Sequence, residues 1–205
     1  DTVLKLGAIR LLSLRPTPLT VSLLRQALSD PLEEVRYAAH LALIAIEEGF
    51  AEKIKQCQET IMDDREDRRT AYERLGEIYR QYAESGLEGD MTRHLNLERA
   101  YEALSQAYTL GPANSRTALS LGEVAIARGD YRQAATFFQS TLKEPSLALD
   151  ASLGLWRTYF EGGDMPALHA ALNDTAPIND FKTDNPQKIV LFEFWINPPE
   201  APLGN

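Results

Sequence analysis

A glycine and aspartate pair recurs at a fixed spacing in the second half of the sequence and constrains the fold more than any other feature. Gly129-Asp130 is followed 34 positions later by Gly163-Asp164. Glycine readily adopts the left-handed conformation that ends a helix, and aspartate can cap the free N–H groups that begin the next helix. Apolar residues recur at steps of three and four on both sides of each pair. The pattern predicts one helical hairpin over residues 115–142 and a second with helices over 147–160 and 166–173.

The residues inside these hairpins follow a recognisable packing pattern. Ala134 and Phe138 stand four positions apart on the second helix, where a small residue lets the partner helix approach. With Leu121 and Gly122 on the first helix, they resemble the tetratricopeptide repeat, whose period is about 34 residues. An earlier segment carries the same signature, with tyrosine in place of tryptophan. Its matching residues are Tyr72, Leu75, Gly76, Tyr79, Ala100, Leu104, Ala107 and Pro112.

This earlier hairpin contains an insertion. Twice as many residues separate Gly76 from Ala100 as separate Gly122 from Ala134. About three helical turns, or a long loop, are therefore added around residues 84–93. Long loops in compact repeats are either functional or disordered. The insertion is a candidate docking site, although a tolerated surface insertion is the simpler interpretation.

The first 29 residues are basic within an acidic chain. They hold Lys5, Arg10, Arg15 and Arg25 against a single acid, Asp1, whereas the whole chain has a net charge of −9. Basic residues close to a membrane helix are typical of its cytoplasmic flank. The segment is thus compatible with an anchor upstream of this chain. A short amphipathic helix covering the end of a helical stack explains it equally well.

Prolines divide this region into separate helices. Pro16 and Pro18 end the first helix, and Thr17 starts a second one that runs to about residue 28. The helix that follows is unusually long and extends to about residue 61. It connects the N-terminal helices to the repeats.

The start of the long helix has a signature of its own. Asp30 is expected to cap it, with Pro31 at the first helical position and Glu33 bonding back to the cap. The string D-P-x-x-x-V-R-x-A-A also resembles the HEAT repeat. That resemblance implies that Val35 packs between helices and that Asp30 and Arg36 bond to neighbouring turns.

Composition and motifs argue against catalysis and against nucleic-acid binding. A net charge of −9 disfavours contact with a phosphate backbone. No pattern for nucleotide binding, for a hydrolytic nucleophile or for a metal occurs, and His40, His94 and His169 lie on separate predicted helices. The single cysteine, Cys57, is typical of a small buried residue. We expect a protein that is not an enzyme and holds no cofactor or metal.

These elements predict an all-α fold. We expect a right-handed α-solenoid of tetratricopeptide-type hairpins, preceded by a HEAT-like helix pair and closed by a capping helix. The predicted domains are 1–62, 63–176 and 177–205. Because a solenoid end exposes the apolar face of its final repeat, a cap is required. The aromatic segment 187–196 is the candidate cap, and it would also suit the groove of a partner.

A solenoid of this kind offers a concave surface formed by the first helix of each hairpin. Its candidate protein-binding residues lie opposite the packing positions, and a solvated inner face without a partner is the alternative. They are Glu73, Glu77, Arg80, Arg116, Leu119, Glu123, Ile126, Leu153, Arg157 and Phe160. The surface lacks the cluster of lysine and asparagine with which chaperone-binding relatives hold a terminal carboxylate. Binding of a chaperone's C-terminal carboxylate is therefore disfavoured.

The order of these features resembles the PelE family of membrane-anchored subunits in bacterial Pel exopolysaccharide synthesis. The most specific residues are Arg15-Pro16-Thr17-Pro18, then Asp30-Pro31 and Val35-Arg36. The resemblance implies two transmembrane helices upstream of Asp1 and a cytoplasmic position at the inner membrane for this portion. It also implies a scaffold for the glycosyltransferase and the cyclic-di-GMP receptor of that machinery. A soluble tetratricopeptide adaptor or chaperone-like regulator is the alternative.

Overall fold

Helix-starting and helix-ending residues divide the chain into ten helices in the part that the structure describes. The computed structural model describes residues 1–63, 67–111, 114–174 and 185–197, and no strand occurs within them. The fold is therefore all-α, as the sequence predicts. The chain forms two compact units, Asp1–Leu110 and Gly111–Asn205. In the first unit the helices are α1 (Thr2–Leu12), α2 (Pro18–Ala27), α3 (Glu33–Met62), α4 (Arg68–Glu84) and α5 (Asp90–Thr109).

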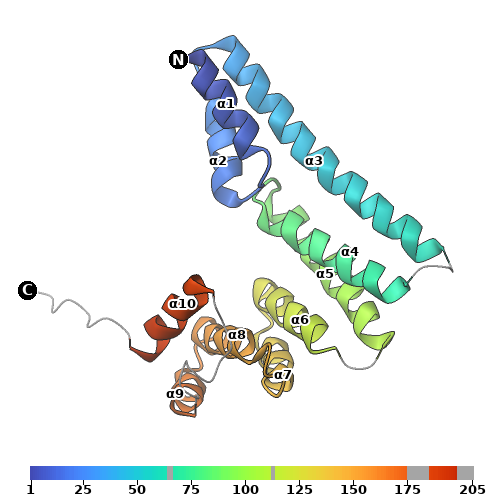
Figure 1. Cartoon of the computed structure of the whole chain (residues 1–205), viewed down its shortest axis with the longest axis vertical. Coiled ribbons are helices and arrows are strands. Elements are labelled where there is room, and N and C mark those ends of the chain that lie inside the picture. The colour runs from blue at the N-terminus through green and yellow to red at the C-terminus, as the bar shows by residue number, and fades with distance from the viewer. Residues whose placement is uncertain (64–66, 112–113, 175–184, 198–205) are drawn as a thin grey trace, which may run out of the picture. The chain divides into compact units, whose positions relative to one another are not determined.

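The first unit is organised along α3, which has 30 residues. Figure 1 shows α1 and α2 beside the first half of α3, and α4 returning along its second half. Thr17 caps α2 in a reciprocal arrangement with Thr20, and Pro18 occupies the first turn. The prolines therefore separate α1 from α2 where the sequence predicts, and the predicted long helix is also confirmed.

The predicted capping of α3 by Asp30 is wrong. The helix begins at Glu33, and its N-cap is Leu32, whose side chain makes no capping hydrogen bond. The Asp30 carboxylate instead accepts hydrogen bonds from the Leu32 N–H at 3.0 Å and from Lys5 Nζ at 2.6 Å. Arg36 Nη1 donates to the backbone carbonyls of Asp30 and Pro31, each at 2.9 Å. A tertiary partner on α1 and the Arg36 side chain thus hold this turn outside the helix.

The core of the first unit lies where α1, α2 and the end of α4 meet α3. Ile9, Leu24 and Val35 are buried in it together with Phe50. The Phe50 ring stacks on Tyr82 of α4, with ring centroids 4.6 Å apart and planes inclined by 10°. Apolar burial of this kind stabilises the unit by about 25 cal/mol for each Å² removed from water.

The insertion between α4 and α5 is packed against the same unit. Both helices are longer than those of the next hairpin, so helix takes up much of the added length. In the connecting turn, the backbone carbonyl of Leu87 accepts a hydrogen bond from Arg25 Nη2 of α2 at 2.7 Å. Gly86 adopts the left-handed conformation (φ +77°) with Pro18 close to it. The insertion joins the α4–α5 hairpin to the N-terminal helices.

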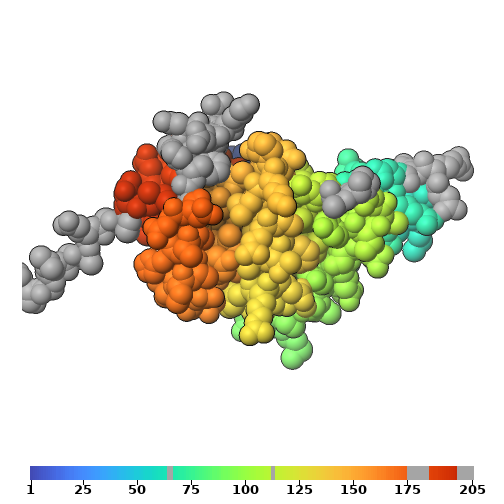
Figure 2. Space-filling view, turned by 90° about the horizontal axis from the view of Figure 1, so that it is seen from below, coloured from blue at the N-terminus to red at the C-terminus, as the bar shows by residue number. Residues whose placement is uncertain are grey.

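The second unit contains two successive hairpins and one further helix. Its helices are α6 (Ser115–Arg128), α7 (Tyr131–Thr141), α8 (Ala148–Glu161), α9 (Met165–Asn173) and α10 (Pro186–Ile196). Figure 2 shows α7, in gold, and α9, in orange, at the surface on the same side of this unit. They are the second helices of the two hairpins. The predicted hairpins over 115–142 and from 147 to 173 are therefore present, with ends shifted by one or two residues.

The corners of the two hairpins have the same geometry at a spacing of 34 residues. Gly129 and Gly163 are both left-handed, with φ of +79° and +74°. The N–H of Asp130 donates to the carbonyl of Ala125, and that of Asp164 donates to the carbonyl of Tyr159, both at 2.8 Å. Both aspartates then cap the following helix. The recurrence in the sequence is a recurrence in backbone structure.

Phe138 on α7 packs between two glycines. Its side chain is fully buried, and its ring lies against Gly122 of α6 and Gly154 of α8. A Cβ atom built on Gly122 would lie 2.7 Å from Phe138 Cζ, and one built on Gly154 would lie 2.5 Å from it. The missing side chains allow three helices to enclose one aromatic ring.

The helix α10 covers one side of α8. Phe192 is buried against Trp156, with ring centroids 5.5 Å apart, and Leu149 and Leu168 belong to the same cluster. Asn185 caps α10 through the Gln187 N–H. The sequence correctly predicts a helix here. Residues 175–184 between α9 and α10, the residues after 197 and Pro112 lie outside the described residues.

Candidate protein-binding surfaces

The α4 residues of the predicted surface form a local ion-pair cluster. Arg80 Nη2 and Nε donate to the two Glu77 oxygens at 2.6 and 3.0 Å, and Arg80 Nη1 donates to Glu84 at 2.7 Å. Glu73 pairs with Arg69 one turn away, at 3.4 Å. Bidentate pairing of this kind fixes side-chain orientation. The cluster has more carboxylates than cations and would suit a cationic partner.

Acidification should weaken the first unit through Glu77. Burial alone would raise the pKa of its carboxyl, but hydrogen bonds and charge from Arg80, with a hydrogen bond from Gln81, outweigh burial and lower that pKa. Such a carboxyl stabilises the fold above its unfolded pKa, about 4.3, and this stabilisation is lost as pH falls through the folded pKa. Glu77→Gln should therefore lower the free energy of unfolding near neutral pH and change it little in acid. Pulsed hydrogen exchange of α4 during urea titrations at the two pH values measures this, and equal effects would contradict it.

The residues predicted on α6 and α8 meet within the second unit. Arg157 Nη1 lies 3.4 Å from Glu123, 34 positions earlier on α6, and Arg157 Nε donates to Glu161 at 2.7 Å. Arg116 is exposed at the start of α6, whereas Leu119 and Leu153 are half-buried beside the core. The ion pair places the outer faces of the two first helices side by side.

An aromatic residue extends this surface. The Phe160 side chain is 56% exposed. Its ring packs edge-on against Trp195 of α10, with ring centroids 5.6 Å apart. The exposed Phe194 ring lies edge-on to the same indole, with ring centroids 6.1 Å apart. Charged residues on α6 and α8 and aromatic residues on α8 and α10 are thus available to a partner of the second unit.

One predicted surface residue is in the core. Ile126 is 3% exposed and packs with Ala125, Phe138 and Leu155. The prediction that it lines an open face is wrong, because α7 and α8 enclose this end of α6. Glu73, Glu77 and Arg80 belong to the first unit, and the other predicted residues belong to the second. Within each unit the structure pairs charged residues of the predicted surface, Glu77 with Arg80 in the first and Glu123 with Arg157 in the second.

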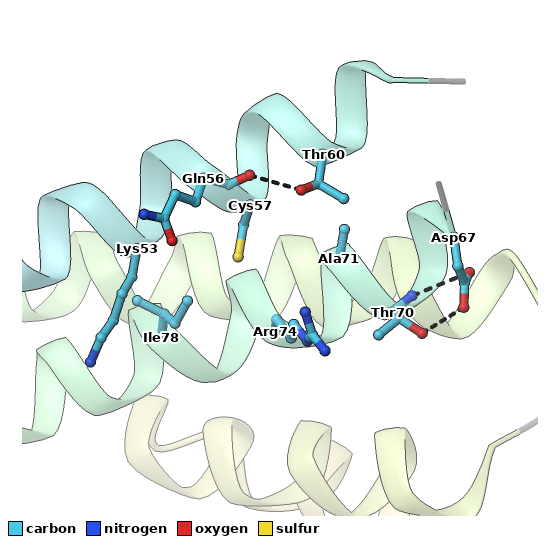
Figure 3. A pocket seen from close by; sticks show the side chains of 9 residues that line it. All are labelled: Lys53, Gln56, Cys57, Thr60, Asp67, Thr70, Ala71, Arg74 and Ile78. Atoms are coloured by element: carbon cyan, nitrogen blue, oxygen red, sulfur yellow. Dashed lines mark hydrogen bonds between the residues drawn. The ribbon is translucent and has the colours of Figure 1, made fainter. Parts of the chain in front are cut away.

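A pocket between α3 and α4 was not predicted. It has a volume of about 430 Å³, and Figure 3 shows Lys53, Cys57 and Thr60 of α3 facing Arg74 of α4 across it. Burial raises the pKa of the Cys57 thiol, although the Arg74 charge opposes this. A protonated thiol is a poor nucleophile. The pocket is lined by the cations Lys53 and Arg74 and by the Asp67 carboxylate, and its Thr60 and Thr70 hydroxyls donate within the chain, so its lining favours neither sign of charge.

A larger groove lies between α1, α2 and the start of α3. Its volume is about 950 Å³, and Ile9, Leu11, Leu12, Leu23 and Val35 line it. Sequence reasoning did not assign a site here. The signal was present in the leucines of the first 28 residues, which exceed what a single helix-packing face needs.

The described residues supply no metal-binding cluster. Within the described ranges, no group of three or more histidine, cysteine, aspartate and glutamate side chains could hold an ion. His40, His94 and His169 lie on α3, α5 and α9. The candidate residues that the structure brings together form ion pairs and exposed apolar surface.

Comparisons with known proteins add no family assignment. Searches against protein-family models, against characterised proteins and against solved structures gave no match to this chain. Among the helices in the described part of the chain, none combines the length and apolar character needed to cross a bilayer.

Proposed function

We propose that this chain is a non-enzymatic adaptor of the tetratricopeptide class, built as a right-handed α-solenoid and used to bind other proteins. The observation that supports this best is the equivalence of the two hairpin corners at Gly129 and Gly163. A period of about 34 residues is that of the tetratricopeptide repeat. Repeats of this kind stack so that their first helices form a continuous binding wall.

The residues on the first helices supply the binding chemistry. Glu123 and Arg157 occupy equivalent positions on α6 and α8 and are partly exposed. Phe160 adds an exposed ring beside them. Aromatic residues and arginine are enriched at the energetic centres of protein interfaces. This surface is the adaptor's principal recognition site in the proposal.

A more specific role follows from the sequence resemblance to the PelE family. In this role the chain is the cytoplasmic portion of an inner-membrane component of a Pel-type exopolysaccharide synthase. It holds the glycosyltransferase and the cyclic-di-GMP receptor subunit together, and segments outside this chain anchor it. The support is the run Arg15-Pro16-Thr17-Pro18 followed by Asp30-Pro31 and Val35-Arg36.

Charge reversal on the second unit tests the binding surface. Arg157→Glu and Glu123→Arg should each weaken binding of the purified receptor or glycosyltransferase by about tenfold, because a partner's charges would meet the wrong sign. The double variant restores the internal ion pair but not partner binding. The exposed pair contributes at most about 1 kcal/mol to stability, so folding should persist. Arg132→Glu on α7 is the matched control.

Isothermal titration calorimetry with each purified subunit measures the outcome. Selective loss in the α6 and α8 variants supports the surface. Equal affinities for all variants would show that the partner does not bind at the α6 and α8 surface. Failure of the wild-type chain to bind either subunit would refute the Pel-type assignment.

A further inference from the structure

The outer face of α1 is apolar. Ile9 is the buried residue that packs this helix into the core of the first unit. Val3, Leu4, Leu11 and Leu14 lie on the opposite side or just beyond the helix end, and they are 70–76% exposed. At 100° per residue, these positions cluster on one side with Gly7 between them. The apolar residues of α1 thus lie on two opposite faces, and only the face of Ile9 has a packing partner in the core of the first unit.

The apolar surface continues onto α2. Leu11 of α1 and Leu23 of α2 line the same groove. Leu19 precedes Leu23 by one helical turn and is 68% exposed. Exposed leucines of the two helices therefore adjoin one another at this groove. Patches of several exposed leucines are uncommon on the surface of a soluble domain and usually mark an interaction site.

Two unpaired arginines accompany this patch. The Arg10 side chain is exposed on α1, and Arg15 lines the groove. In the described ranges, neither guanidinium has a hydrogen-bond or ion-pair partner, whereas Lys5 is paired with Asp30. Residues 1–29 contain one carboxylate, Asp1, in a chain of net charge −9. The local charge is opposite in sign to that of the whole protein.

We propose that α1 and the adjoining part of α2 bind the surface of an anionic phospholipid bilayer. The exposed leucines enter the boundary between headgroups and acyl chains, and Arg10 and Arg15 contact lipid phosphates. This combination of an apolar face with flanking cations is typical of interfacial helices. The acidic remainder of the chain is repelled by the same membrane, which fixes the orientation. This lipid contact is independent of the proposed adaptor function.

A second copy of the chain fits the patch less well. In a symmetric dimer through α1 both facing surfaces would carry the same excess of positive charge, and like charges at an interface are unfavourable. An anionic bilayer satisfies both the apolar and the cationic side chains. It also needs no complementary protein shape.

Vesicle co-sedimentation of the full chain tests the proposal. Vesicles of equal parts phosphatidylcholine and phosphatidylglycerol should bind the protein, and pure phosphatidylcholine vesicles should bind it much less. Leu4→Gln combined with Leu11→Gln should weaken binding by about tenfold or more, because each buried leucine contributes strongly to partitioning. Arg10→Gln combined with Arg15→Gln should weaken it and reduce its dependence on salt. Met91→Gln combined with Leu95→Gln, two exposed apolar residues of α5, is the matched control.

A fluorescent label distinguishes insertion from surface attraction. In a Cys57→Ala background, Leu4→Cys carrying an environment-sensitive dye should shift to shorter wavelength with anionic vesicles, and Met91→Cys should not. Absence of vesicle binding would overturn the proposal, as would equal losses in the α1 variant and the α5 control. Self-association of the wild type that disappears in the α1 variant, without lipid binding, would assign the patch to a second copy and also overturn it. Each variant is checked for unchanged helicity.

Discussion

Replacing Trp156 by alanine is expected to lower the free energy of unfolding of the second unit by about 3–5 kcal/mol. The indole is 1% exposed and is enclosed by Leu149, Leu168 and Phe192. Its centroid lies 5.5 Å from that of Phe192 and 6.5 Å from that of Trp195. Alanine would leave a cavity at the junction of α8, α9 and α10. Because α10 has only one buried residue, it should be the first helix to detach.

The fluorescence of Trp195 measures the effect of Trp156→Ala on stability. The chain has two tryptophans, both in the second unit, so in Trp156→Ala the remaining emission reports on α10 alone. We expect a lower urea midpoint, emission from Trp195 at longer wavelength before urea is added, and faster hydrogen exchange over 186–196. Trp156→Phe keeps most of the apolar volume and should cost clearly less. An unchanged urea midpoint in Trp156→Ala would show that α10 does not depend on this cluster.

Helices and their corners could be predicted because local chemistry determines them. Gly129 and Gly163 end helices through a backbone conformation that other residues adopt at a cost. Thr17 with Pro18 starts α2 by contacts within four residues of the chain. Signals of this range can be read in one sequence without knowing what packs against what.

Two predictions that depended on a neighbouring helix were wrong. Asp30 has the chemistry of a helix cap, but Lys5 of α1 lies close enough to pair with its carboxylate. Ile126 was placed on an open face by helical phase, and the close approach of α7 and α8 buries it. Phase alone gives the direction of a side chain on its helix. It does not show how far the neighbouring helices wrap around it.

The candidate surfaces also include features that the sequence pattern predicts and features that depend on how neighbouring helices pack. The sequence predicts that Glu123 and Arg157 share a face, because a period of 34 residues places them at equivalent positions, and the structure pairs them. The groove between α1 and α2 depends on how two short helices rest on α3. The sequence contains the leucines but does not reveal which of them remain exposed. Only the folded arrangement separates packing leucines such as Leu24 from exposed ones such as Leu19.

Gly154→Ala should destabilise the second unit by about 1–3 kcal/mol, although alanine favours helices more than glycine does. The added methyl group would lie 2.5 Å from Phe138 Cζ, well inside van der Waals contact. The same ring also lies against Gly122 of α6, which leaves it little room to shift. The strain should fall on the contact between α7 and α8. Gly49→Ala in α3 has no atom within 4 Å of the new methyl group and should instead stabilise its helix by about 0.5–1 kcal/mol.

A double-mutant cycle with Phe138→Leu identifies the cause of this loss. Leucine lacks the outer ring atoms, and the equivalent positions of the neighbouring hairpins, Leu104 and Leu172, already hold leucine. In the Phe138→Leu background, Gly154→Ala should cost at least about 1 kcal/mol less than in the wild type, since contacting residues couple by such amounts. Urea unfolding followed by tryptophan emission measures all four proteins. Gly49→Ala, the control for helix propensity, lies in the first unit, which has no tryptophan, so its urea unfolding is followed by far-ultraviolet circular dichroism. A cost for Gly154→Ala that is the same in both backgrounds would mean that close packing of the ring is not what this glycine provides.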